Sequence, residues 1–136
     1  MTKTLDLRPR VFVVNQPMRR DPATNAWVNA MDLGAAREHG ELIFMLPAGR
    51  LPADANAIVR AVRRSMASFR PEDYLLLVGD PRAIAIAAAV AADLTDGSLN
   101  LLNWRRSQLC YEASIVDVYA DAAPEPVGSD DDSWNN

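Results

Sequence analysis

The amino-acid sequence predicts a single small α/β domain with a mixed, mostly parallel sheet flanked by helices. Two apolar runs, Glu41–Pro47 and Tyr74–Gly79, do not alternate with polar residues, as expected for strands covered on both faces. Two helical segments, which begin at Asp54 and Asp80, alternate with strand-like runs. The chain of 136 residues is long enough for one domain with a core and too short for two.

The first predicted strand is Arg10–Asn15, a β-branched run that stops before Pro17. The stretch that follows is rich in turn-forming residues. Within it, Asp32 is placed to cap a short helix over Leu33–His39, which Gly40 ends.

From Asp54 onward the hydrophobic period becomes that of a helix. Apolar residues recur at spacings of four, four and three: Ile58, Val62, Met66 and Phe69. We therefore predict an amphipathic helix of about fifteen residues that Asp54 caps and that ends before Pro71. The acidic pair Glu72 and Asp73, which precedes the next strand, is interpreted as solvated.

The strand over Tyr74–Gly79 leads directly into a second helix. Asp80 is suited to its N-cap and Pro81 to its first turn, and the helix is expected to continue to about Asp93. Its alanine-rich body is apolar on every side, so we expect it to be nearly buried.

An antiparallel hairpin is predicted from Leu99–Trp104 and Leu109–Val118, joined by a short polar turn. The apolar residues change face between Ile115 and Val116, which predicts a bulge or an edge at that point. With the hairpin as an antiparallel edge, the parallel part becomes a Rossmann-like core of three strands joined by right-handed crossovers. Its strands are Glu41–Pro47, Tyr74–Gly79 and Leu99–Trp104.

Charge divides the chain into a body and a tail. All fourteen Lys and Arg residues lie at or before Arg106, whereas the segment from Asp117 onward has six acids and no base. Residues 1–116 therefore carry a formal charge of +2 and the last twenty residues −6, which together give −4. We predict the α/β domain over 1–118 and a disordered acidic tail over 119–136.

The remaining composition favours a cytoplasmic protein without contact to a membrane. No apolar run reaches the length of a membrane span, and the N-terminus has no signal-peptide pattern. A single cysteine, Cys110, fits a reducing compartment.

The corner between the third strand and the second helix is a candidate anion site formed by Gly79, Asp80 and Arg82. Helix N-termini beyond the carboxyl ends of strands attract anions. However, the corner lacks the glycines of a phosphate-binding loop, and Asp80 places a carboxylate where the anion would sit. A structural helix cap is the favoured interpretation.

Two groups of basic residues are candidates for binding nucleic acid or a partner protein. The first lies on the hairpin and includes an aromatic residue: Trp104, Arg105 and Arg106. The second lies on the first helix: Arg60, Arg63 and Arg64. The alternative for both groups is a solvated surface, and a body with a charge of +2 is not strongly basic.

The tail offers a short motif in which three acids precede an aromatic residue: Asp130, Asp131, Asp132 and Trp134. We interpret it either as a passive, solubilising segment or as a motif that docks on a partner.

Four segments carry a family resemblance: "VFVVNQPMRRD", "DLGAAREHGELIFMLP", "DYLLLVGDPRAIAIAAAVAA" and "LNLLNWRRSQLCYEASIVDV". Through them the body, roughly residues 10–118, resembles a group of small proteins encoded by tailed bacteriophages and prophages. The resemblance implies a phage or prophage origin and a place inside the bacterial host cell. It implies no reaction and no catalytic residues.

We therefore expect a small non-enzymatic phage accessory protein that associates with a host or phage protein, or with itself. The alternative is nucleic-acid binding in phage replication or packaging, with the acidic tail as a competitor for the basic surface. A nucleotide- or phosphate-binding enzyme is the third hypothesis. No metal or cofactor is expected, because His39 and Cys110 form no ligand pattern.

Overall fold

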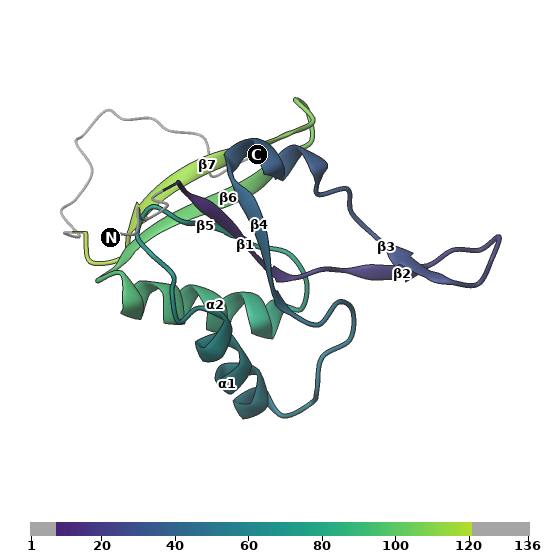
Figure 1. Ribbon diagram of the computed structural model, residues 1–136, viewed down its shortest axis with the longest axis horizontal. Helices are drawn as coiled ribbons and strands as arrows, with labels where there is room; N and C mark the ends of the chain where they lie inside the picture. The colour runs from purple at the N-terminus through teal and green to yellow at the C-terminus, as the bar shows by residue number, and fades with distance from the viewer. Residues whose placement is uncertain (1–7, 121–136) are drawn as a thin grey trace, which may run out of the picture.

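Four parallel strands and one antiparallel strand form the central sheet (Figure 1). The structure, a computed structural model, describes residues 8–120, so most of the predicted tail lies outside the described residues. The strands stand in the order β4-β1-β5-β6-β7. Their bounds are Arg10–Asn15 for β1, Glu41–Leu46 for β4, Tyr74–Leu76 for β5, Ser98–Arg105 for β6 and Cys110–Asp117 for β7. The predicted fold class is confirmed.

The first strand occupies the centre of the sheet. β1 pairs in parallel with β4 through Arg10 and Glu41, and with β5 through Val11 and Tyr74. The predicted three-strand parallel core was therefore incomplete. β5 also ends at Leu76 rather than at Gly79.

Helices cover both faces of the sheet, and the direction of the chain explains which helix covers which face. The connection from β1 to β4 runs one way across the sheet, and the connections from β4 to β5 and from β5 to β6 run the other way. Right-handed crossovers place connections of opposite direction on opposite faces. The 3-10 helix η1 (Gly34–His39) accordingly lies on one face, and α1 (Ala55–Ser65) and α2 (Pro81–Leu94) lie on the other (Figure 1).

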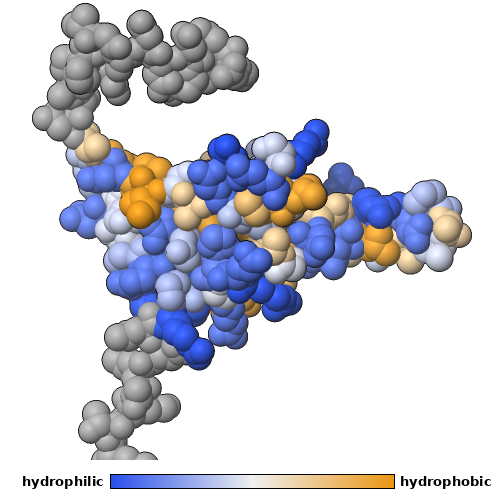
Figure 2. Space-filling view, turned by 90° about the horizontal axis from the view of Figure 1, so that it is seen from above, coloured by the Kyte–Doolittle hydropathy of each residue, from blue (hydrophilic) through white to orange (hydrophobic). Residues whose placement is uncertain are grey.

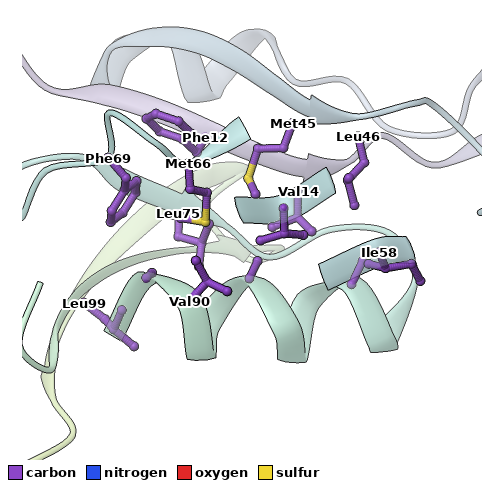
Figure 3. Close-up of a cluster of buried hydrophobic side chains, with 14 of the residues drawn as sticks. Phe12, Val14, Met45, Leu46, Ile58, Met66, Phe69, Leu75, Val90 and Leu99 are labelled. Atoms are coloured by element: carbon purple, nitrogen blue, oxygen red, sulfur yellow. The ribbon is translucent and has the colours of Figure 1, made fainter. Parts of the chain in front are cut away.

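The core consists of one hydrophobic cluster on each face of the sheet. Figure 3 shows the larger cluster, in which Phe12 and Val14 of β1 pack toward the side chains of Ile58 and Val90 from the two helices. Residues of β1 that point the other way join the smaller cluster under η1. Residues 11–14 are consequently all fully buried, which explains a strand without hydrophobic alternation.

Both α-helices begin at the predicted caps. Asp54 accepts a hydrogen bond from the backbone N–H of Asn56 at 2.9 Å, and Asp80 accepts one from Arg82 at 2.8 Å. α1 ends at Ser65 and is shorter than predicted, although Met66 and Phe69 remain buried in the turn that follows.

Two burial predictions were wrong. α2 was predicted to be nearly buried, but one side of it faces solvent at Ala85 and Ala89. Asp73 is not solvated: its side chain is fully buried, where Arg10 and Arg70 bind it at 2.8 and 3.2 Å. Burial of a carboxylate is tolerated only with such partners.

The change of burial along β7 is confirmed, but a bulge is not its cause. The β6–β7 register runs without interruption from Ser98–Asp117 to Arg105–Cys110. Instead, the cover on this face ends along the strand: Tyr111 beneath η1 is 4% exposed, whereas Ile115 is 83% exposed.

A two-stranded arm, absent from the predicted elements, projects from the body (Figure 1). It comprises β2 (Met18–Arg20), β3 (Trp27–Asn29) and the turn between them. The Asp21 side chain stabilises that turn, since it accepts hydrogen bonds from the backbone of Ala23 and the hydroxyl of Thr24. Within residues 8–120, no helix has the length and apolar character needed to cross a membrane.

Candidate functional site

The strand order creates a switch point between β1 and β5. If the five strands of this sheet are numbered by their order along the chain, their spatial order across the sheet is second, first, third, fourth and fifth. The connections after β1 and after β5 therefore depart to opposite faces, which leaves a crevice outside the carboxyl ends of these two strands. In open α/β sheets, ligands bind at such a crevice.

Asn15, the last residue of β1, holds this crevice together. Its side chain is buried, and Nδ2 donates hydrogen bonds to the carbonyl oxygens of Pro47 at 2.8 Å and Gly49 at 3.1 Å. Its Oδ1 accepts a hydrogen bond of 2.9 Å from the backbone N–H of Asp80. One amide thus joins the ends of three adjacent strands. Asn15 was not among the predicted site residues, although a polar residue that ends an apolar strand is the available signal.

The Gly79–Arg82 corner lies at the same crevice, where its residues form close contacts and hydrogen bonds with neighbouring backbone and with each other. Gly79 has a φ of 104° and packs against Asn15 so closely that an added Cβ would lie 2.2 Å from the Asn15 carbonyl oxygen. Arg82 binds both carboxylate oxygens of Asp80 and donates to the carbonyls of Pro52 and Ala53.

The Asp80–Arg82 pair governs the charge of the corner. Hydrogen bonding to Arg82 lowers the pKa of Asp80, and hydrogen bonding to Asp80 raises the pKa of Arg82. Both groups are therefore charged at neutral pH and offset each other. These contacts favour the structural interpretation, and the anion site remains a prediction.

A cleft of about 1140 Å³ opens over the switch point, between the arm and the β6–β7 hairpin. We call it the switch-point cleft. Its base includes Asn15, Leu76 and Gly79; its walls include Met18, Trp27 and Met31 on the arm side, Trp104 and Tyr111 on the hairpin side, and Arg50 in the loop after β4. The walls are mainly apolar and aromatic, which is the usual character of a binding cleft.

Two tryptophans on opposing walls leave large parts of their surface in solvent. Trp27 is 60% exposed and Trp104 is 40% exposed. The guanidinium of Arg20 lies 5.0 Å from the centre of the Trp27 ring, and the Trp104 ring meets Tyr111 edge-on at 5.0 Å. Sequence reasoning selected Trp104 and missed Trp27, because Trp27 lies in the stretch read as turns.

The two predicted basic groups lie on different parts of the molecule. Arg60, Arg63 and Arg64 belong to α1, which packs against β4 and α2. Trp104 and Arg105 end β6, on the other half of the sheet from β4, and Arg106 follows them in the turn. The structure does not bring the two groups together.

Some of these arginines already have acidic neighbours. Arg63 pairs with Asp93 at 2.9 Å, Arg105 pairs with Glu112 at 2.9 Å, and Arg60 lies 3.9 Å from Asp54. The candidate tail residues lie outside the described residues: Asp130, Asp131, Asp132 and Trp134.

The part of the chain that the structure describes contains no group of three or more His, Cys, Asp or Glu placed to hold a metal ion. His39 contacts neighbouring structure instead: its Nε2 lies 3.0 Å from the Tyr111 carbonyl oxygen, and its ring meets Tyr74 edge-on.

The fold and the cleft define a small open-sheet α/β domain whose arm and hairpin enclose its switch point. Residues 9–118 match the model of the family described as Phage Pam3 gp32-like protein. Because this match covers most of the chain, the protein belongs to that family, and the expected resemblance to phage proteins is confirmed. Comparison with curated proteins and with solved structures finds no match.

Proposed function

We propose that this protein is a phage accessory protein that binds another protein through the switch-point cleft. The observation that carries the proposal is the pair of exposed tryptophans, Trp27 and Trp104, on opposing walls of a mainly apolar cleft. Membership of a phage protein family supports a role as a phage accessory protein, and the cleft supports binding to another protein.

The chemistry of the walls suits a side chain of a protein partner. Tryptophan is enriched among the residues that dominate binding energy at protein interfaces. Met18 and Met31, which line the same cleft, are flexible and polarizable, and adapt to apolar groups of different shape. At about 1140 Å³, the cleft is also large for a small ligand. An apolar anchor with its flanking backbone fits these properties.

Single substitutions at the two tryptophans test this function. The tagged full chain and its variants would be used to capture proteins from extract of infected or lysogenic host cells. A true partner should be retained by the wild type and lost with Trp27→Ala and with Trp104→Ala. Truncating a central interface tryptophan typically costs about 2 kcal/mol or more of binding energy.

Phe44→Ala is the matched control. Phe44 is 50% exposed on β4, the edge strand on the opposite side of the sheet from the hairpin, and does not line the cleft. The Phe44→Ala variant should capture the same protein as the wild type. Loss of capture with Phe44→Ala but not with the tryptophan variants would move the binding surface to the β4 edge and contradict the proposal.

Nucleic-acid binding is the second candidate, because four arginines accompany the cleft tryptophans. Arg19 and Arg20 lie on the arm with Trp27, and Arg105 and Arg106 follow Trp104. Bases stack on tryptophan while arginines contact phosphates. This candidate predicts binding of single-stranded DNA that falls steeply with salt and that Arg20→Gln weakens. Absence of binding at low salt would exclude this candidate, and binding unaffected by Trp27→Ala would show that the cleft does not carry it.

A further inference from the structure

We propose that the C-terminal segment of this same chain occupies the switch-point cleft, with Trp134 as its apolar anchor. The segment would then compete with a protein partner for the cleft. This inference deepens the proposed function and rests on the cleft being a binding site.

The place where the described chain ends makes this contact feasible. Asp117 of β7 pairs with Ser98, at the opposite end of the hairpin from Trp104 and Tyr111. Six strand positions separate those two pairs, a distance of roughly 20 Å at about 3.3 Å per residue. The fourteen residues from 121 to 134 span up to roughly 46 Å when extended, so they reach from Ala120 to the cleft.

The sheet surface between these two points is open and partly apolar. Directly opposed residues of an antiparallel pair share a face, so Asn100 and Ile115 lie on the same face as Trp104 and Tyr111. Ile115 is 83% exposed, and η1 covers this face only near Tyr111. Figure 2 shows hydrophobic patches on the otherwise hydrophilic surface of the body. A chain that follows β7 back toward the cleft would pass over Ile115.

Charge complementarity favours the acidic segment as the occupant. Among the described residues, four arginines of the segments that form the cleft walls carry no ion pair: Arg19, Arg20, Arg50 and Arg106. Of these, Arg50 lines the cleft, and Arg20 lies against the ring of Trp27. The segment places Asp130, Asp131 and Asp132 within four residues of Trp134. Trp134 would pack between the walls that hold Trp27 and Trp104, while the three carboxylates face these guanidinium groups.

A spin label on the full chain tests the contact. In a Cys110→Ser background, Ser133→Cys places the only reactive thiol beside Trp134. The label should abolish the indole N–H signals of Trp27 and Trp104 in a ¹⁵N-labelled sample, and should leave the amide signal of Phe44 at full intensity. Adding Trp134→Ala should restore both indole signals, and high salt should restore them partly because it screens the charges.

Three results would overturn the inference. Indole signals that persist beside the label would show that the segment does not enter the cleft. Signals still lost after Trp134→Ala would show that Trp134 is not the anchor. A mixed sample tests for a second copy: if the indole signals of ¹⁵N-labelled chain without a spin label are lost when spin-labelled chain without ¹⁵N is added, the contact belongs to a second copy.

Protein capture separates this inference from the proposed function. If the segment competes for the cleft, full-length Trp134→Ala should retain more of the partner than the wild type does. Capture that is unchanged by Trp134→Ala but lost with Trp27→Ala would contradict the inference and leave the proposed function intact. Capture insensitive to Trp27→Ala would contradict the proposed function itself.

Discussion

The backbone N–H of Asp80 donates a hydrogen bond of 2.9 Å to Oδ1 of Asn15, across the switch point of the sheet. The same amide of Asn15 reaches the loop after β4 through Pro47 and Gly49. The base of the cleft is therefore fixed by hydrogen bonds, while its aromatic walls belong to the arm and the hairpin.

Asn15→Ala should be strongly destabilising. It would remove the partner of the Pro47 and Gly49 carbonyls and of the Asp80 N–H, in three partly buried hydrogen bonds. At about 1 kcal/mol or more for each lost bond, we expect a loss of roughly 2–4 kcal/mol in the free energy of unfolding. Urea denaturation measures it. Asn103→Ala, which removes an exposed bond of 3.3 Å to Ser114, should change stability by less than about 0.5 kcal/mol.

Gly79→Ala and Gly49→Ala should differ in effect although both glycines have a positive φ. A Cβ on Gly79 would lie 2.2 Å from the carbonyl oxygen of Asn15, whereas one on Gly49 would meet only the Met18 side chain, at 3.4 Å. Gly49→Ala should therefore cost only backbone strain of about 1–2 kcal/mol. Gly79→Ala should cost more, because backbone must move. Equal losses in thermal denaturation would contradict this account.

Asp73→Asn should destabilise the protein by roughly 3–5 kcal/mol, because Arg10 and Arg70 would lose a buried anionic partner. The exposed pair of Arg63 and Asp93 offers a control: Asp93→Asn should cost at most about 1 kcal/mol. Chemical denaturation of both variants compares the two environments.

The same carboxyl group predicts a pH dependence. Burial raises the pKa of Asp73, but hydrogen bonds from Arg10 and Arg70 outweigh burial and hold that pKa below its ordinary value. The wild type should therefore keep this stabilisation above about pH 4 and lose it as the pH falls further. Asp73→Asn should lack this part of the acid dependence. An identical acid profile for the variant would refute the assignment.

Tyr111→Phe should leave the protein as stable as the wild type or make it more stable. The Tyr111 hydroxyl is buried and finds no hydrogen-bond partner among residues 8–120, so its removal takes away an unsatisfied polar group. Burial, followed by the charge of Asp32, raises the pKa of Tyr111. Stability should therefore fall in the wild type as the pH rises above about 10, and less so in Tyr111→Phe. Tyr119→Phe, at an exposed position, should behave as the wild type.

Most elements of the domain follow from local sequence patterns. Asp54 and Asp80 predicted both α-helix starts because the capping chemistry of their side chains is local. The arm was missed because β2 and β3 have only three residues each, too few for a strand pattern.

The candidate site depends on contacts that local patterns do not contain. Asn15 matters because its amide meets Pro47 and Asp80, which are far away in the sequence. Trp27 and Trp104 line one cleft only because the sheet order brings the arm and the hairpin to the same edge. The solvated reading of Asp73 was wrong because its partner Arg10 lies 63 residues earlier in the chain.

The central place of β1 has a consequence for how the chain folds. Among the strands of residues 8–120, β1 is synthesised first, yet its pairing with β4 closes 31 residues and its pairing with β5 closes 63. Parallel pairings of such separation form slowly because the loop entropy is lost before the contacts form. Until residues Tyr74 to Leu76 have been synthesised, the backbone groups of β1 that pair with β5 have no strand partner on the nascent chain. We therefore expect aggregation during synthesis to begin at this strand, which becomes the most protected one in the finished protein.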